Sequence, residues 1–132
     1  MIELRATIAE VLAKRPEGIA AAWLFGSRAT GRERPDSDVD VALLFTHDPP
    51  RTLDGLGFDI GAAIEEHVEL PVDLVVLNRA PVELVHYVLR DGQLVYETDA
   101  AARVAFEVRA RAEYFDLLPI LEQYRRPPER LR

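Results

Sequence analysis

Hydrophobic residues gather in three short continuous runs, at positions 19–25, 39–45 and 71–77. Runs of this length that carry no helical spacing are typical of buried strands. Polar or turn-forming residues bound each run, which favours the same interpretation. We therefore expect three strands, with Asp40 and Asp73 as the charged residues within the second and third of them.

Helical spacing of the apolar residues occupies most of the remaining chain. It predicts four helices, over residues 3–14, 53–69, 80–89 and 100–116. Pro81 suits the first turn of the third helix, Asp99 suits a cap for the fourth, and Pro119 is expected to interrupt that helix. A short edge strand is expected at residues 93–97.

Two carboxylates open the second apolar run. Gly26 and Ser27 end the first run, ten residues follow, and Asp38 and Asp40 come next. Alternate residues of a strand point to the same face, so the two carboxylates are expected to lie close together. They repel each other unless a cation neutralises them, and Mg²⁺ takes oxygen ligands from one or two carboxylates together with substrate phosphates.

A glycine turn and a third carboxylate extend this pattern. Gly26 lets the backbone approach a ligand closely, and Ser27 is a good N-cap for a short helix over residues 28–31, whose N–H groups would face a phosphate. Asp73 lies in the third apolar run. Each feature alone is common in ordinary turns and strand ends. Together, three carboxylates beside a phosphate-binding turn suit two metal ions and a nucleoside triphosphate.

The site also predicts the topology of the sheet. Ser27 follows the end of the first strand, whereas Asp38 and Asp40 lie at the start of the second, so these strands must be antiparallel for the residues to meet. Asp73 lies at the start of the third strand, which must then be parallel to the second. The helix over residues 53–69 supplies the crossover, which is expected to be right-handed. The predicted fold is a mixed α/β sheet with core order 1-2-3.

At this point the chain resembles the nucleotidyltransferase superfamily that has the DNA polymerase β type of palm. The hallmark of that superfamily is Gly-Ser, about ten residues, Asp-x-Asp, and a later single Asp on a neighbouring strand. The matching residues are Gly26, Ser27, Asp38, Asp40 and Asp73. The flanking Leu-Phe-Gly-Ser-Arg-Ala and Ser-Asp-Val-Asp-Val most resemble the small minimal nucleotidyltransferase (MNT) proteins of prokaryotes. The resemblance implies a polymerase β-like palm, flanked by helices.

The resemblance also implies a metal-dependent reaction, in which AMP is transferred from ATP to a hydroxyl group. The Gly26-Ser27 turn would hold the β- and γ-phosphates. Asp38 and Asp40 would coordinate two Mg²⁺ ions, and Asp73 would bind the catalytic metal and orient or help deprotonate the acceptor hydroxyl.

Composition narrows the remaining possibilities. The 132 residues suit a single nucleotidyltransferase domain over 1–132, with a core at about 1–98 and a C-terminal helix and tail at 99–132. There is no cysteine, no signal-like N-terminus and no membrane-length apolar run, so a cytoplasmic protein is expected. A net charge of −7 argues against direct nucleic-acid binding. Arg28 is a candidate nucleotide-binding contact on a locally basic rim.

The acceptor is indicated only by the resemblance. MNT proteins pair with HEPN-domain partners in toxin–antitoxin modules, where the MNT antitoxin adenylylates a tyrosine of the HEPN ribonuclease, so a hetero-oligomer with such a partner is expected. The apolar segment 115–121 is either an anchor for that partner or part of the core. Two alternatives stay open, a nucleotidyltransferase for a small-molecule acceptor and a non-catalytic binding antitoxin with the same fold.

Overall fold

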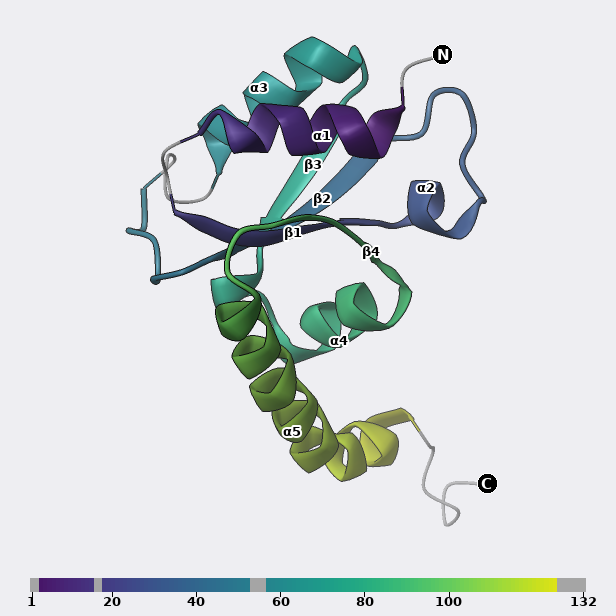
Figure 1. Cartoon of the computed structure of the whole chain (residues 1–132). Coiled ribbons are helices and arrows are strands. Elements are labelled where there is room, and N and C mark those ends of the chain that lie inside the picture. Colours follow the sequence, from purple (N-terminus) through teal and green to yellow (C-terminus); the bar gives the residue numbers. More distant parts are fainter. Residues whose placement is uncertain (1–2, 16–17, 53–56, 126–132) are drawn as a thin grey trace.

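A four-stranded mixed sheet with helices on both faces forms the centre of the computed structural model, which describes residues 3–15, 18–52 and 57–125 (Figure 1). The strands are β1 (Ile19–Phe25), β2 (Val39–Phe45), β3 (Val72–Val76) and β4 (Gln93–Glu97). The helices are α1 (Leu4–Ala13), α2 (Ser27–Thr30), α3 (Phe58–Val68), the 3₁₀ turn η1 (Leu77–Arg79), α4 (Val82–Asp91) and α5 (Ala100–Arg125).

The strand order is β3–β2–β1–β4. Strands β1 and β2 are antiparallel, whereas β2 and β3 are parallel and are joined through α3. The predicted core order 1-2-3 is therefore confirmed, and the predicted edge strand β4 pairs antiparallel with the free side of β1. Every residue of β1 is buried, as expected for a central strand covered on both faces.

Two hydrophobic layers enclose the sheet. Helices α1 and α3 cover one face, and their packing residues include Ile8, Leu12 and Ile64. Helix α4 and the first half of α5 cover the other face, where Trp23 and Val88 are among the buried residues. Alternation along β2 assigns its odd-numbered residues to the α1–α3 layer and its even-numbered residues to the α4–α5 layer.

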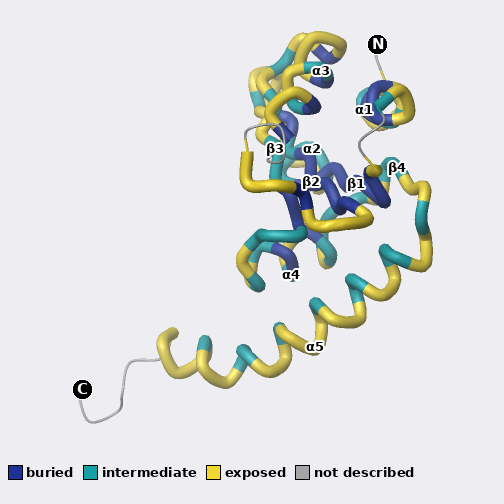
Figure 2. The backbone as a smooth tube through the Cα atoms, turned by 90° about the vertical axis from the view of Figure 1, so that its left-hand side faces the viewer, coloured by how far each residue is buried: buried dark blue, intermediate teal, exposed yellow. Residues whose placement is uncertain are grey.

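Helix α5 runs on to Arg125, so the prediction that it ends at Asp116 and is interrupted by Pro119 was wrong. A proline removes one backbone hydrogen bond from a helix interior and crowds the preceding turn. Pro119 is exposed, so water can solvate the carbonyl that loses its partner. Figure 2 shows the C-terminal half of α5 extending beyond the body of the protein. Asp99 does cap the helix, because its Oδ1 accepts a hydrogen bond from the Ala102 N–H at 3.0 Å.

Helix α3 is shorter than the helix predicted over residues 53–69. It begins at Phe58, after Gly57 in a left-handed conformation with φ of +83°, and the predicted residues 53–56 lie outside the described part of the chain. The helix ends at Val68, and Glu69, which is also left-handed, is its C-cap.

No helix in the described ranges combines the length and apolarity needed to cross a membrane.

Candidate active site

The strand register brings two of the predicted carboxylates side by side. Asp40 of β2 is paired with Asp73 of β3 and, across the other edge of β2, with Phe25 of β1. Gly26 directly follows Phe25, so the glycine turn lies beside Asp40 at the same end of the sheet. Asp38 lies two residues before Asp40, just outside the start of β2. Gly26, Asp38, Asp40 and Asp73 therefore lie together at one end of the sheet.

The carboxylates point toward the α4–α5 side of the sheet. Val39 and Val41 pack in the α1–α3 layer, so Asp40 between them faces the opposite side. The register places Asp73 on that same side, because its neighbour Leu74 packs against the α1–α3 layer. Asp40 is half-buried, whereas Asp73 is exposed. The carboxylate of Asp73 is therefore open to solvent on the α4–α5 side.

Gly26 contacts the carboxylate of Asp40 so closely that any side chain at position 26 would displace the turn or the carboxylate. A Cβ added at Gly26 would lie 2.1 Å from Asp40 Oδ2. Its backbone, with φ of +75° and ψ of −155°, lies in a region that glycine alone occupies readily. Both facts require glycine at this position, and they place the turn directly against the central carboxylate.

Helix α2 is a single turn that starts at Ser27, with Gly26 as its N-cap. The expectation that Ser27 would be the cap was wrong, because the glycine conformation brings the chain into the helix one residue earlier. The Ala29 N–H donates to Gly26 O at 3.1 Å, which closes the turn. Gly31 ends it in a left-handed conformation. Ser27 is half-buried, in the first helical position after Gly26.

The pKa of Asp40 depends on its burial and on the two neighbouring carboxylates. Burial raises the pKa of Asp40, and the charges of Asp73 and Asp38 raise it further. An ionised Asp40 is therefore less favourable in the folded protein than in the unfolded chain. Such a repulsive group is what a bound cation would stabilise.

The donor set suits a hard cation, although it does not form a closed cage. Within the described residues, no group of three or more His, Cys, Asp or Glu side chains is arranged as a ready metal site. Uncompensated carboxylates repel each other, so an open arrangement is the expected one. Oxygen donors on one face, next to the Gly26-Ser27 turn, fit Mg²⁺, which completes its coordination with water and substrate phosphates.

Arg28 connects α2 to the loop that leads to Asp38. Its Nη2 and Nε donate to Ser37 O at 2.8 and 3.0 Å, and Nη2 also reaches Arg34 O and Pro35 O at 3.4 Å. These bonds fix the segment immediately before the first carboxylate. In this structure the guanidinium therefore orders the loop, and a phosphate contact by Arg28 stays a prediction.

Replacement of Arg28 by lysine separates these two roles. Lysine keeps the charge but loses the planar pair of donors that grips Ser37 O. We expect Arg28→Lys to lower kcat/KM for ATP about tenfold, the effect of losing one charged hydrogen bond. The measurement is steady-state kinetics, with Arg32→Lys in the same loop as the control. A rate within twofold of wild type would instead indicate that the charge of Arg28 alone matters.

Tyr87 lies beside the site, although the sequence pattern did not predict a position there for it. Tyr87 of α4 makes an edge-to-face contact with Phe25, with ring centroids 6.3 Å apart, and the Arg90 guanidinium lies over its ring at 5.7 Å. Tyr87 thus ties α4 to the strand residue that precedes Gly26. Its place in the α4 periodicity predicts only packing, because the contact depends on tertiary structure.

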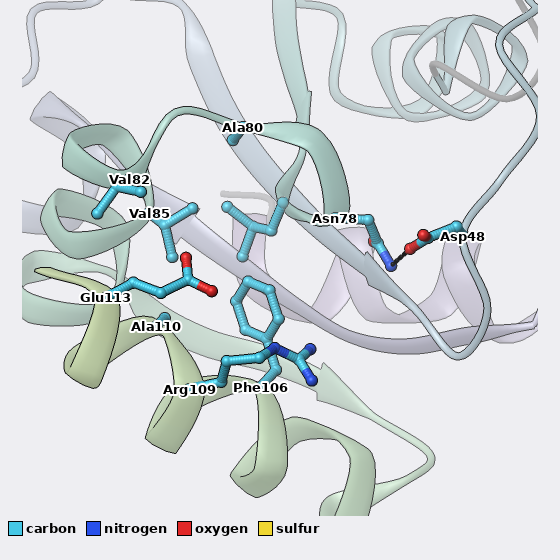
Figure 3. Close-up of a pocket in the computed structure, with 10 residues that line it drawn as sticks. Asp48, Asn78, Ala80, Val82, Val85, Phe106, Arg109, Ala110 and Glu113 are labelled. Atoms are coloured by element: carbon cyan, nitrogen blue, oxygen red, sulfur yellow. Dashed lines mark hydrogen bonds between the residues drawn. The ribbon is translucent and has the colours of Figure 1, made fainter.

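A separate hollow of about 130 Å³ lies at the other end of the sheet (Figure 3). Asn78 follows β3 and binds Phe45 at the end of β2, donating to its O at 3.1 Å and accepting from its N–H at 2.9 Å. Arg109 and Glu113 of α5 also line the hollow. The three predicted carboxylates lie at the opposite ends of the same strands, so this hollow is not the candidate active site.

Comparisons with known proteins agree with this geometry. The family model described as "Polymerase beta, Nucleotidyltransferase" matches residues 6–101. A protein adenylyltransferase MntA of Aphanizomenon flos-aquae (strain 2012/KM1/D3) is 32% identical over 102 residues, which cover 72% of this chain and 67% of the relative.

Solved structures with low sequence identity share the fold. A chain of a toxin–antitoxin complex with AMP-PNP has a TM-score of 0.75 at 21% identity, covering 92% of this chain and 98% of that one. A second matching chain comes from the structure of a tri-AMPylated Shewanella oneidensis HEPN toxin in complex with MNT antitoxin. It has a TM-score of 0.65 at 18% identity, and the match covers 93% of this chain and 97% of the chain in that complex. The family model over residues 6–101 and the similarity to MntA show that the chain belongs to the polymerase β-like nucleotidyltransferase family.

Proposed function

We propose that this nucleotidyltransferase transfers AMP from ATP to a hydroxyl group of a HEPN-type toxin, and that it thereby acts as the antitoxin. The acceptor that we propose is a tyrosine hydroxyl. The observation that carries the proposal is the contact of Gly26 with Asp40, next to Asp73 on the adjoining strand. This arrangement supports phosphate binding by the turn, because the turn lies against the carboxylate that would hold the metal. The place of action would be the cytoplasm, where ATP is available.

Each residue of the site would have a different role in the reaction. The backbone of Gly26 and Ser27 would hold the β- and γ-phosphates, while Asp38 and Asp40 would hold Mg²⁺. Bound Mg²⁺ neutralises phosphate charge and lowers the pKa of the acceptor hydroxyl. Asp73 would also contribute to metal binding, and it would orient the hydroxyl and accept its proton. The acceptor oxygen then bonds to the α-phosphorus as the bond to the β-phosphate oxygen breaks, and pyrophosphate leaves.

The exposed face of α5 supports a protein acceptor. No residue of this helix is buried, and Figure 2 shows it extending away from the body beyond α4. The first half of α5 packs on the face of the sheet toward which the carboxylates point. Val104, Val108 and Phe115 recur at helical spacing on its outer face, and each is about half exposed or more. The relative MntA is a protein adenylyltransferase, and the structural neighbours pair an MNT antitoxin with a HEPN toxin. We therefore assign this face to the HEPN partner.

Binding of ATP should depend on Mg²⁺. Saturating Mg²⁺ and ATP together should raise the melting temperature by roughly 5 °C or more, since a ligand that binds only the folded state stabilises it. ATP with a chelator should raise it by less than about 2 °C, because the carboxylates then repel the triphosphate. Differential scanning fluorimetry gives both values, and equal shifts under the two conditions would argue against a metal-bridged site.

Docking on α5 should depend on Phe115, whose side chain is 67% exposed. With a co-encoded HEPN protein as acceptor, Phe115→Ser should slow AMP transfer about tenfold, the cost of a lost aromatic anchor. Phe58→Ser is the matched control, because Phe58 is 64% exposed but lies on α3, on the other side of the sheet. ATP affinity should stay unchanged in both variants. Equal transfer rates for the two would exclude this face.

A further inference from the structure

The short helix that carries Ser27 has little structure of its own to hold it in place. Helix α2 is four residues long, and a helix of that length is not stable by itself in water. Its orientation decides where the Ser27 hydroxyl and the first N–H groups point. External contacts must therefore fix α2 before a triphosphate binds.

A glutamine from the far edge of the sheet supplies one such contact. Gln93, the first residue of β4, donates from Nε2 to Ala29 O at 2.8 Å. Among the described residues outside 26–37, Gln93 is the one whose side chain hydrogen-bonds the backbone of α2. The bond is partly buried, which limits competition from water.

The other end of the same amide is also fixed. Gln93 Oε1 accepts from Arg5 Nη1 of α1 at 3.2 Å, and Gln93 itself is paired with Leu24 of β1. Both amide groups thus have partners, and the side chain is held between α1, β4 and α2. Leu24 lies two residues before Gly26, so the anchor lies close to the turn that it supports.

We propose that Gln93 is a positioning residue for the nucleotide, because it holds α2 by Ala29 O and so fixes the Gly26-Ser27 turn, whose glycine contacts Asp40. This inference rests on the proposed role of the Gly26-Ser27 turn in phosphate binding. Gln93 points to the α1 side of the sheet, like Leu24, whereas the carboxylates point to the α4 side. It acts on the nucleotide through α2.

The variant Gln93→Met keeps the length of the side chain but removes its donor. We expect the Kd for Mg²⁺-ATP to rise about fivefold, the effect of one lost hydrogen bond on the bound geometry. The KM for ATP should rise with it, while kcat changes less, because the carboxylates stay on β2 and β3. Isothermal titration calorimetry and steady-state kinetics give these values, at a temperature where all variants are fully folded.

Two controls separate positioning from general stability. Arg5→Met removes the bond to α1 but leaves the bond to Ala29, so its Kd should stay within twofold of wild type. Ile64→Val destabilises the fully buried α3 core away from the site, and it should lower the melting temperature without changing the Kd. Backbone amide exchange in α2 should become faster in Gln93→Met alone among the three.

The outcomes distinguish this inference from the proposed function. If wild type binds Mg²⁺-ATP and Gln93→Met binds it equally well, the positioning role is wrong. A loss of affinity that Ile64→Val reproduces would also overturn it, because the effect would then follow stability. If wild type does not bind Mg²⁺-ATP, the proposed function fails, and faster amide exchange in α2 would still show whether Gln93 anchors that helix.

Discussion

Asp40→Asn should abolish AMP transfer, with a loss of at least about 10³-fold, while the protein stays folded. Asp40 is the central carboxylate, in contact with the Gly26 turn and paired with Asp73. Asparagine keeps the shape of the side chain but cannot supply an anionic ligand. Transfer of label from ATP to the acceptor measures the loss. Asp38→Asn should have the same direction of effect.

The same substitution should slightly stabilise the protein in metal-free buffer. The folded-state pKa of Asp40 is raised above its unfolded value, so ionisation costs folding stability once the pH exceeds the unfolded pKa, and the cost is complete above the folded pKa. At neutral pH asparagine removes that cost. We expect a rise in melting temperature of roughly 2 °C, because the carboxylate is partly solvated. A wild-type transfer rate, or a marked fall in stability, would contradict the assignment of Asp40.

Gly26→Ala should lower transfer by at least about 100-fold, because the new methyl group would collide with the catalytic carboxylate. The Cβ would lie 2.1 Å from Asp40 Oδ2, so either the turn or the carboxylate must move. The backbone conformation adds strain of roughly 1–3 kcal/mol. Kinetics and a melting curve of the variant measure the two effects separately.

Gly31→Ala is the matched control for this strain. Gly31 has almost the same φ, +74°, but nothing lies within 4 Å of the position of its Cβ. Its ψ of +17° lies in the milder left-handed region, so Gly31→Ala should lose about 1 kcal/mol of stability and retain transfer within about threefold of wild type. Comparable losses of activity in the two variants would mean that backbone strain, and not contact with Asp40, disables the site.

Local patterns in the sequence were sufficient to predict the strands and the juxtaposition of the site. The run at residues 39–45 is continuous because β2 is covered on both faces, and Asp40 is the polar exception at its start. The requirement that Gly26, Asp40 and Asp73 meet determined the strand directions, which the register then confirmed.

Other features depend on contacts between distant segments, which local patterns do not encode. Gln93 reaches Ala29 across 64 positions of the chain, and the edge strand showed no sign of that role. Arg28 was expected to face phosphate on grounds of charge, whereas its donors bind loop carbonyls. Pro119 was expected to end a helix, yet α5 continues because the exposed backbone around it can be hydrated.

Transfer of AMP to a protein hydroxyl is tested most directly by the intact mass of the partner. The chain would be co-expressed with a co-encoded HEPN protein, as wild type and as Asp73→Asn, and the partner analysed by mass spectrometry with site mapping. The account predicts one or more AMP additions on tyrosine with wild type and none with Asp73→Asn. An unmodified partner, together with active transfer to a small alcohol or aminoglycoside by the same preparation, would contradict it.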